Sequence, residues 1–219
     1  MLPFYLLEKI IKLAISKKKN FIFIIFILFF LNSPSRSVTN NVLVTIDNSI
    51  ITELDLKKEI EFIKFINKSE IDGNSEKVRK DIIQSLIDKK IKKIEIDNSK
   101  IETTEKEIED YTYNYLSNNK INDEILNDFY ASKQIEKDYL KNMIIIEIGW
   151  IKLIRKIYEN RININLTEIN EEIKKQSKNS EDVEKIKNQI IDLERNKVLN
   201  KFSVTHLEKS KKKFFIKFL

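Results

Sequence analysis

The single histidine of the chain, His206, is the first residue to test for catalysis, because possible partners lie close to it in the sequence. These partners are Ser203, Glu208 and Ser210. A serine nucleophile needs a strained turn that presents its hydroxyl to the histidine, and backbone donors that bind the oxyanion. No Gly-x-Ser-x-Gly pattern surrounds either serine. The sequence therefore predicts an exposed helical histidine without a catalytic role.

Two pairs of neighbouring carboxylates could in principle act as acid and base: Glu171 with Glu172, and Glu107 with Asp110. Both pairs lie in segments with a helical pattern and many charged residues, where carboxylates usually form a solvated face. We expect no catalysis from them.

Composition excludes several other kinds of chemistry. The chain has 219 residues with no Cys and one His, which rules out a Cys/His zinc site, a disulfide scaffold and a thiol nucleophile. Its two glycines, Gly73 and Gly149, lie outside any phosphate-binding pattern. The sequence therefore predicts a protein that is not an enzyme and needs no cofactor, metal or nucleotide.

Aromatic side chains are concentrated in the middle of the chain. Taken singly, each is best explained by core packing, because aromatic side chains contribute large packing areas. However, Tyr111 and Tyr115 share a helical face while Tyr113 points away from it, so one helix contact cannot bury all three. As a set they are our candidates for a groove that binds hydrophobic or aromatic peptides: Tyr111, Tyr113, Tyr115, Phe129, Tyr130 and Tyr139.

The basic charge of the chain is concentrated at its N-terminus. The formal net charge is +6, from 40 basic and 34 acidic residues, and residues 1–37 hold six of the basic residues and only one of the acidic ones. The remainder is nearly neutral, so no nucleic-acid partner is expected.

The same N-terminal segment has the pattern of a secretory signal peptide. Eleven apolar residues (21–31, FIFIIFILFFL) follow three lysines, and a helix of that length would reach about 16 Å, against about 30 Å for the hydrocarbon core of a membrane. Ser35 and Ser37 supply the small residues that a signal peptidase needs, which predicts cleavage after Ser37. An uncleaved membrane anchor remains the alternative. Either reading delivers residues 38–219 to the far side of the membrane.

Periodicity predicts a short hairpin followed by helices. Two β-branched runs flank Asp47 and Asn48, a pair that tolerates a tight turn. Thr52 and Thr104 are expected to cap helices. The longest apolar stripe predicts one helix of some 30 residues over 132–161. The expected elements are strands 42–46 and 49–52, helices 52–67, 75–96, 104–116, 123–130, 132–161, 167–178 and 182–200, a short helix capped by Ser203, and a strand over 214–219 that joins the hairpin in one sheet.

This order of elements resembles the periplasmic chaperone family SurA. VTIDNSIITELDL (44–56) is similar to the opening hairpin and first helix of that family, and the stretch over 86–111 to its second helix, connector and capped helix. The segment 139–173 looks like its long helix and exit segment, and KFSVTHLEKSKKKFFIKFL (201–219) like its closing helix and strand. The resemblance implies a mainly α fold with a small β-sheet, in which the N-terminal hairpin pairs with the C-terminal strand.

The resemblance also implies a function. SurA-like chains usually carry parvulin-type prolyl isomerase domains between the exit segment and the closing helix, and this chain has no room for one between Thr167 and Asp182. We therefore expect one chaperone domain over 38–219, with a core (42–166), a connector (167–181) and returning elements (182–219). The implied activity is an ATP-independent periplasmic holdase for unfolded outer-membrane proteins, without isomerase activity. The alternative is a membrane-tethered structural subunit of an envelope assembly machine with one fixed partner.

Overall fold

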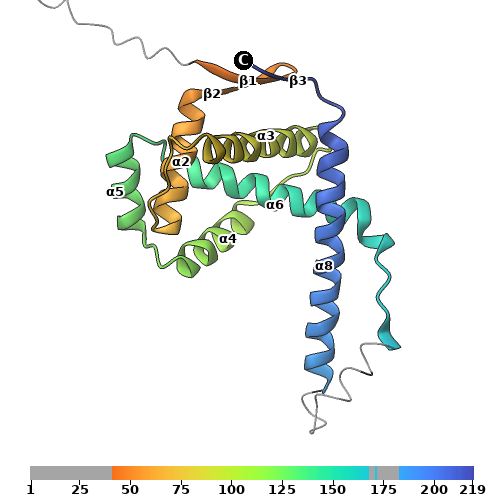
Figure 1. Ribbon diagram of the computed structural model, residues 1–219. Coiled ribbons are helices and arrows are strands. Elements are labelled where there is room, and N and C mark those ends of the chain that lie inside the picture. The colour runs from red at the N-terminus through yellow and green to blue at the C-terminus, as the bar shows by residue number, and fades with distance from the viewer. Residues whose placement is uncertain (1–40, 168–170, 172–182) are drawn as a thin grey trace, which may run out of the picture. The chain divides into compact units, whose positions relative to one another are not determined.

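The computed structural model describes residues 41–167, 171 and 183–219 (Figure 1). The predicted leader and most of the predicted helix over 167–178 lie outside these residues. The described part is mainly helical with a small three-stranded antiparallel sheet, which confirms the predicted fold class. Its elements are β1 (Val42–Ile46), β2 (Ser49–Thr52), α2 (Glu53–Asn67), α3 (Glu76–Asn98), α4 (Glu105–Asn118), α5 (Asp123–Lys133), α6 (Tyr139–Tyr158), the 3-10 helix η1 (Glu159–Arg161), α8 (Val183–Lys211) and β3 (Ile216–Phe218).

The sheet joins the two ends of the described chain, as the sequence predicts. Its strand order is β2-β1-β3, and both pairs are antiparallel. Val44 lies opposite Phe218 and Ile46 opposite Ile216. Next to the hairpin turn, the amide of Asp47 donates to the carbonyl of Phe215 at 3.1 Å. The edge strand β3 is therefore bonded directly to the hairpin.

One face of the sheet packs on helix α3. Val44 and Ile46 are fully buried there against Ile87 and Ile91 of α3. Phe214, just before β3, contacts the same cluster. This packing explains why fully buried and partly buried residues alternate from Leu43 to Ile46, because successive side chains of a strand point to opposite faces.

The predicted helix starts at Thr52 and Thr104 are both confirmed. Each threonine hydroxyl accepts a hydrogen bond from the backbone amide three residues later, at Asp55 and Glu107, and the carboxylate of that residue accepts one from the threonine amide. These reciprocal bonds satisfy backbone donors that a helix N-terminus otherwise leaves unpaired.

The single helix predicted over 132–161 is wrong. Helix α5 runs to Lys133, and α6 begins only at Tyr139. Gln134 takes the left-handed conformation, with φ at 54°, and the amides of Gln134 and Ile135 both donate to the Tyr130 carbonyl. The apolar spacing continues across this break because Ile135 and Tyr139 pack on the same core from different elements.

The C-terminal helices are longer than predicted. The sequence predicts one helix to residue 200 and a second one capped by Ser203, but α8 is continuous from Val183 to Lys211. Ser203 does not cap a helix: its hydroxyl accepts a hydrogen bond from the Trp150 indole at 2.8 Å. Figure 1 shows α8 across the ends of α3 and α6, and buried Leu199 packs there with Trp150 and Leu153.

Helices α3 and α6 pack closely in the middle of the fold. A Cβ on Gly149 of α6 would come within 3.1 Å of Ile96 on α3, so the contact depends on a residue without a side chain. A second contact is polar: buried Glu59 of α2 accepts from Lys89 of α3 at 2.5 Å and from the Tyr139 hydroxyl of α6 at 2.7 Å. This network connects three helices.

Within 41–167, 171 and 183–219, no helix combines the length and apolar character that crossing a membrane requires.

Candidate functional site

The best candidate site is a groove beside helix α4, which we call the α4 groove. It has a volume of about 640 Å³ and lies where α4, the α4–α5 loop and the start of α6 meet. Its lining combines apolar side chains with a polar rim: Glu105, Ile108, Glu109, Thr112, Tyr113, Leu116, Ser117, Ile121, Asn122, Asp123 and Lys141.

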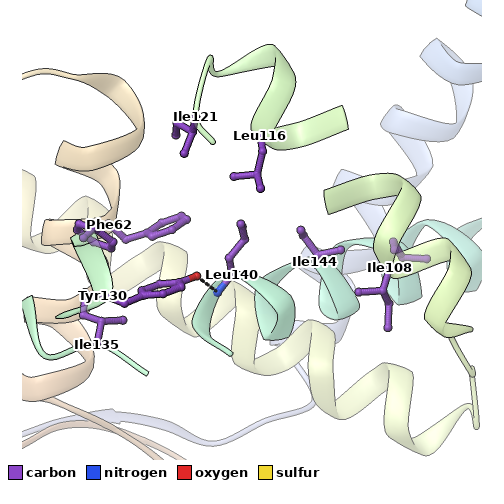
Figure 2. Close-up of a cluster of buried hydrophobic side chains, with 10 residues drawn as sticks. Phe62, Ile108, Leu116, Ile121, Tyr130, Ile135, Leu140 and Ile144 are labelled. Atoms are coloured by element: carbon purple, nitrogen blue, oxygen red, sulfur yellow. Dashed lines mark hydrogen bonds between the residues drawn. The ribbon is translucent and has the colours of Figure 1, made fainter. Parts of the chain in front are cut away.

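Helical spacing places these side chains on one face of α4. Ile108, Thr112 and Leu116 follow each other at four-residue steps, so they stand one above the next along the helix. Ile108 and Leu116 are nearly buried and form the floor with Ile121. Figure 2 shows these three residues among the buried side chains that extend to Leu140 and beyond. The groove therefore has a floor held by the protein core.

Ion pairs fix α4 on α6. The Lys152 ammonium lies 2.8 Å from Glu107, and its hydrogen bond is the main reason that the pKa of this carboxyl is lowered to about 2. At the rim, Lys141 and Glu105 are 2.6 Å apart, and the same contact raises the pKa of Lys141. Both pairs are accessible to solvent, so they orient α4 more than they stabilise it.

The three tyrosines of α4 differ in exposure and in what they contact. Tyr113 lines the α4 groove and is 74% exposed. Tyr111 is 37% exposed and does not line the groove. Tyr115 is partly buried and packs against the core. Of these candidates, only Tyr113 faces the groove.

The other three aromatic candidates are packed inside the protein. Phe129 and Tyr130 are buried in the core cluster, and the Tyr130 hydroxyl accepts a hydrogen bond from the Leu140 amide (Figure 2). Tyr139 packs on Phe62 with ring centroids 5.3 Å apart. Burial, the largest cause, and the neighbouring Glu59 raise the pKa of Tyr139. None of the three lines the α4 groove, and all three contribute to the packing of the core.

No family model and no curated protein matches the chain. The resemblance to SurA therefore rests on the residues and the order of elements alone.

Sequence reasoning missed the apolar floor of the α4 groove and Lys141 at its rim. Ile108, Leu116 and Ile121 have the spacing of ordinary core residues, and nothing in the sequence separates a groove floor from a fully covered core. Lys141 reaches the rim from another helix. The interruption of the apolar stripe by Thr112 is the one signal that could have indicated an open face.

A second groove lies between α2 and α5, with a volume of about 650 Å³. Phe65 and Phe129 stack in it with ring centroids 4.1 Å apart. Its lining is more charged than that of the α4 groove, and the Glu61–Lys133 ion pair closes part of it at 2.6 Å. It suits apolar ligands less well.

His206 is not the exposed residue that the sequence predicts. It is held in a partly buried site, where its Nδ1 lies 2.9 Å from the Tyr158 hydroxyl and its Nε2 lies 3.8 Å from Glu95. Burial is the main cause that lowers the pKa of His206. Among the described residues no serine hydroxyl bonds to this ring, and the Ser203 hydroxyl is already bonded to Trp150.

Of the two carboxylate pairs, only Glu107 and Asp110 have both members among the described residues. Glu107 is engaged by Thr104 and Lys152, and Glu172 lies outside the described residues. In the part of the chain that the structure describes, no three Asp, Glu or His side chains gather to hold a metal ion.

Proposed function

We propose that the protein is an ATP-independent holdase that binds unfolded outer-membrane proteins through the α4 groove, in the periplasm and without prolyl isomerase activity. The observation that carries the proposal is the combination of a fixed apolar floor, the exposed Tyr113 ring and a charged rim in one groove. Segments destined for a membrane barrel alternate apolar and polar residues. Such a segment can place apolar side chains on the floor and polar ones at the rim.

Weak binding is what this geometry supports. Each buried apolar side chain contributes about 1.5 to 3 kcal/mol, and association and ordering costs offset much of the sum, so affinities should be micromolar. A holdase that works without nucleotide must release its client by dissociation, and weak binding permits this. While a client segment is bound in the groove, it cannot pair edge to edge with another unfolded strand.

Tyr113→Ala is the direct test of the α4 groove. We expect this variant to weaken binding to an unfolded outer-membrane barrel protein by about tenfold, because it removes a large aromatic contact. Binding affinity and suppression of aggregation without ATP are the measurements. The melting temperature should not change, because Tyr113 is 74% exposed.

The matched control is Tyr111→Ala, which changes the same residue type on the same helix outside the groove. It should retain client binding. Equal losses in both variants, or none in Tyr113→Ala, would place the client elsewhere. If the unsubstituted chain suppresses the aggregation of no barrel protein, the holdase proposal fails.

The state of the leader distinguishes the proposal from its alternative. For a periplasmic holdase we expect removal of residues 1–37, so that the mature chain begins at Val38. N-terminal sequencing of protein from the envelope fraction measures this. A mature chain that still begins at Met1 would favour the membrane-tethered subunit with a fixed partner.

A further inference from the structure

Strand β3 forms one edge of the sheet, and its outer side is open in the described residues. The carbonyl of Phe215 accepts a hydrogen bond from the amide of Asp47, just after β1, and the amide of Leu219 donates to the carbonyl of Leu43 in β1. Backbone groups alternate along a strand, so those of Lys217 also face β1, whereas those of Ile216 and Phe218 face away from it. The outer edge of β3 therefore carries two amides and two carbonyls that do not bond to β1.

Exposed apolar side chains surround this edge. In the register of the sheet, Ile50, Thr45 and Lys217 form a row on the face opposite buried Val44. Phe215 and Leu219 lie two positions from Lys217, so they flank it on the same face. Phe215 is 72% and Leu219 65% exposed. An added strand would find an apolar residue, a lysine and another apolar residue beside it.

Charge decides what kind of strand fits. Lys211 and Lys213 pair with Asp88 and Glu95, but within 41–167, 171 and 183–219 no carboxylate pairs with Lys217. A strand that pairs with β3 would place one side chain directly beside this ammonium, where an opposite charge stabilises the pair. A second copy is disfavoured, because full antiparallel pairing of β3 with itself sets two Lys217 residues opposite each other.

We propose that the open edge of β3 binds an extended segment of another polypeptide as a fourth strand, and that it selects segments with an acidic residue between two apolar residues on one face. Backbone hydrogen bonds to Ile216 and Phe218 supply the affinity, and Lys217 supplies the selectivity. The site is independent of the α4 groove and goes beyond the holdase proposal, because it does not need Tyr113.

The test uses a fluorescent peptide, Ser-Val-Thr-Glu-Thr-Val-Ser, whose glutamate and valines share one face. Its binding to the purified full-length chain is measured by fluorescence anisotropy. Methylation of the backbone nitrogens of both threonines should weaken binding by about tenfold, because it removes the donors that reach β3. Equal binding of the methylated peptide would overturn the proposal.

Two variants test the same edge from the protein side. Phe218→Pro removes an amide that faces the open edge and leaves the bonds to β1 in place, as edge strands allow. It should weaken binding by about tenfold, whereas Phe218→Ala, which keeps the amide, should change it less than about threefold. Unchanged binding in Phe218→Pro at an unchanged melting temperature would contradict the proposal.

Charge reversal tests the selectivity. Lys217→Glu should bind the glutamate peptide severalfold more weakly and should prefer a peptide with lysine in its place. Failure of this exchange would remove Lys217 from the site. Analytical ultracentrifugation tests the other possible occupant, a second copy of the chain. A dimer that Phe218→Pro dissociates would mean that a second copy, and not a segment of another polypeptide, pairs with the edge.

Discussion

Deletion of residues 214–219 is expected to unfold the protein or to lower its melting temperature sharply. The deletion removes β3, which bonds to β1, and it removes Phe214 and Ile216 from the cluster that covers Val44 and Ile46. Full burial of one such side chain contributes about 1.5 to 3 kcal/mol, and these two partly buried residues together contribute about as much as one. Natural domains are stable by only about 5 to 15 kcal/mol, so the loss is a large fraction of the total. Thermal unfolding followed by circular dichroism measures it.

Phe215→Ser is the matched control, because this residue of the same tail is 72% exposed. It should leave the melting temperature unchanged. If the deletion also leaves it unchanged, the tail contributes nothing to the fold and the sheet does not form in solution.

Lys89→Met is expected to cost about 3 kcal/mol of unfolding free energy. The carboxylate of Glu59 is 3% exposed, and without Lys89 the Tyr139 hydroxyl is the one partner that remains bonded to it among the described residues. Removal of one partner from a buried ion pair is strongly destabilising, because an uncompensated charge stays inside the protein. Urea denaturation gives the free energy.

Replacement of both partners should restore most of the loss. Glu59→Leu combined with Lys89→Met leaves no charge to bury, and such exchanges are often neutral or stabilising. A double variant as unstable as Lys89→Met alone would show that shape, and not the buried charge, governs this contact.

Local signals predicted most of the helix starts and the sheet. Thr52 and Thr104 each precede an acidic residue at the position that completes a capping box, and that pattern is local. The hairpin has a similarly local signal in its turn. The pairing of β1 with β3 could be expected from the order of elements, because a hairpin alone is marginally stable in water.

Helix ends were harder to predict than helix starts, because no glycine follows the described helices at the positions with positive φ. The described residues with positive φ are all other residue types, and neither glycine has positive φ. Sequence reasoning looks for glycine at such positions. Because position 134 is a glutamine, the sequence did not indicate that the helix predicted over 132–161 is interrupted there. Four of these positions follow helices, namely Lys68, Lys100, Lys120 and Gln134, and the fifth, Asp47, lies in the hairpin turn.

The candidate site could be predicted only in part. An aromatic side chain in a helix gives the same sequence signal whether it faces the core or a groove, because both positions follow the helical period. Tyr113 was separable from its neighbours by its direction, and it alone of the six lines the α4 groove. Phe129 and Tyr130 became core residues through the break at Gln134, which turns α5 back onto α2 and α6.

The pairing of β1 with β3 also has a consequence for the timing of folding. Asp47 and Phe215 bond across a separation of 168 positions, so a ribosome must synthesise nearly the whole described chain before β1 gains its second neighbour. Until then β1 has an unsatisfied edge, and contacts between distant segments form slowly because a long loop must close first. Newly made chains should therefore remain open to translocation, chaperones and proteases until residues 216–218 emerge.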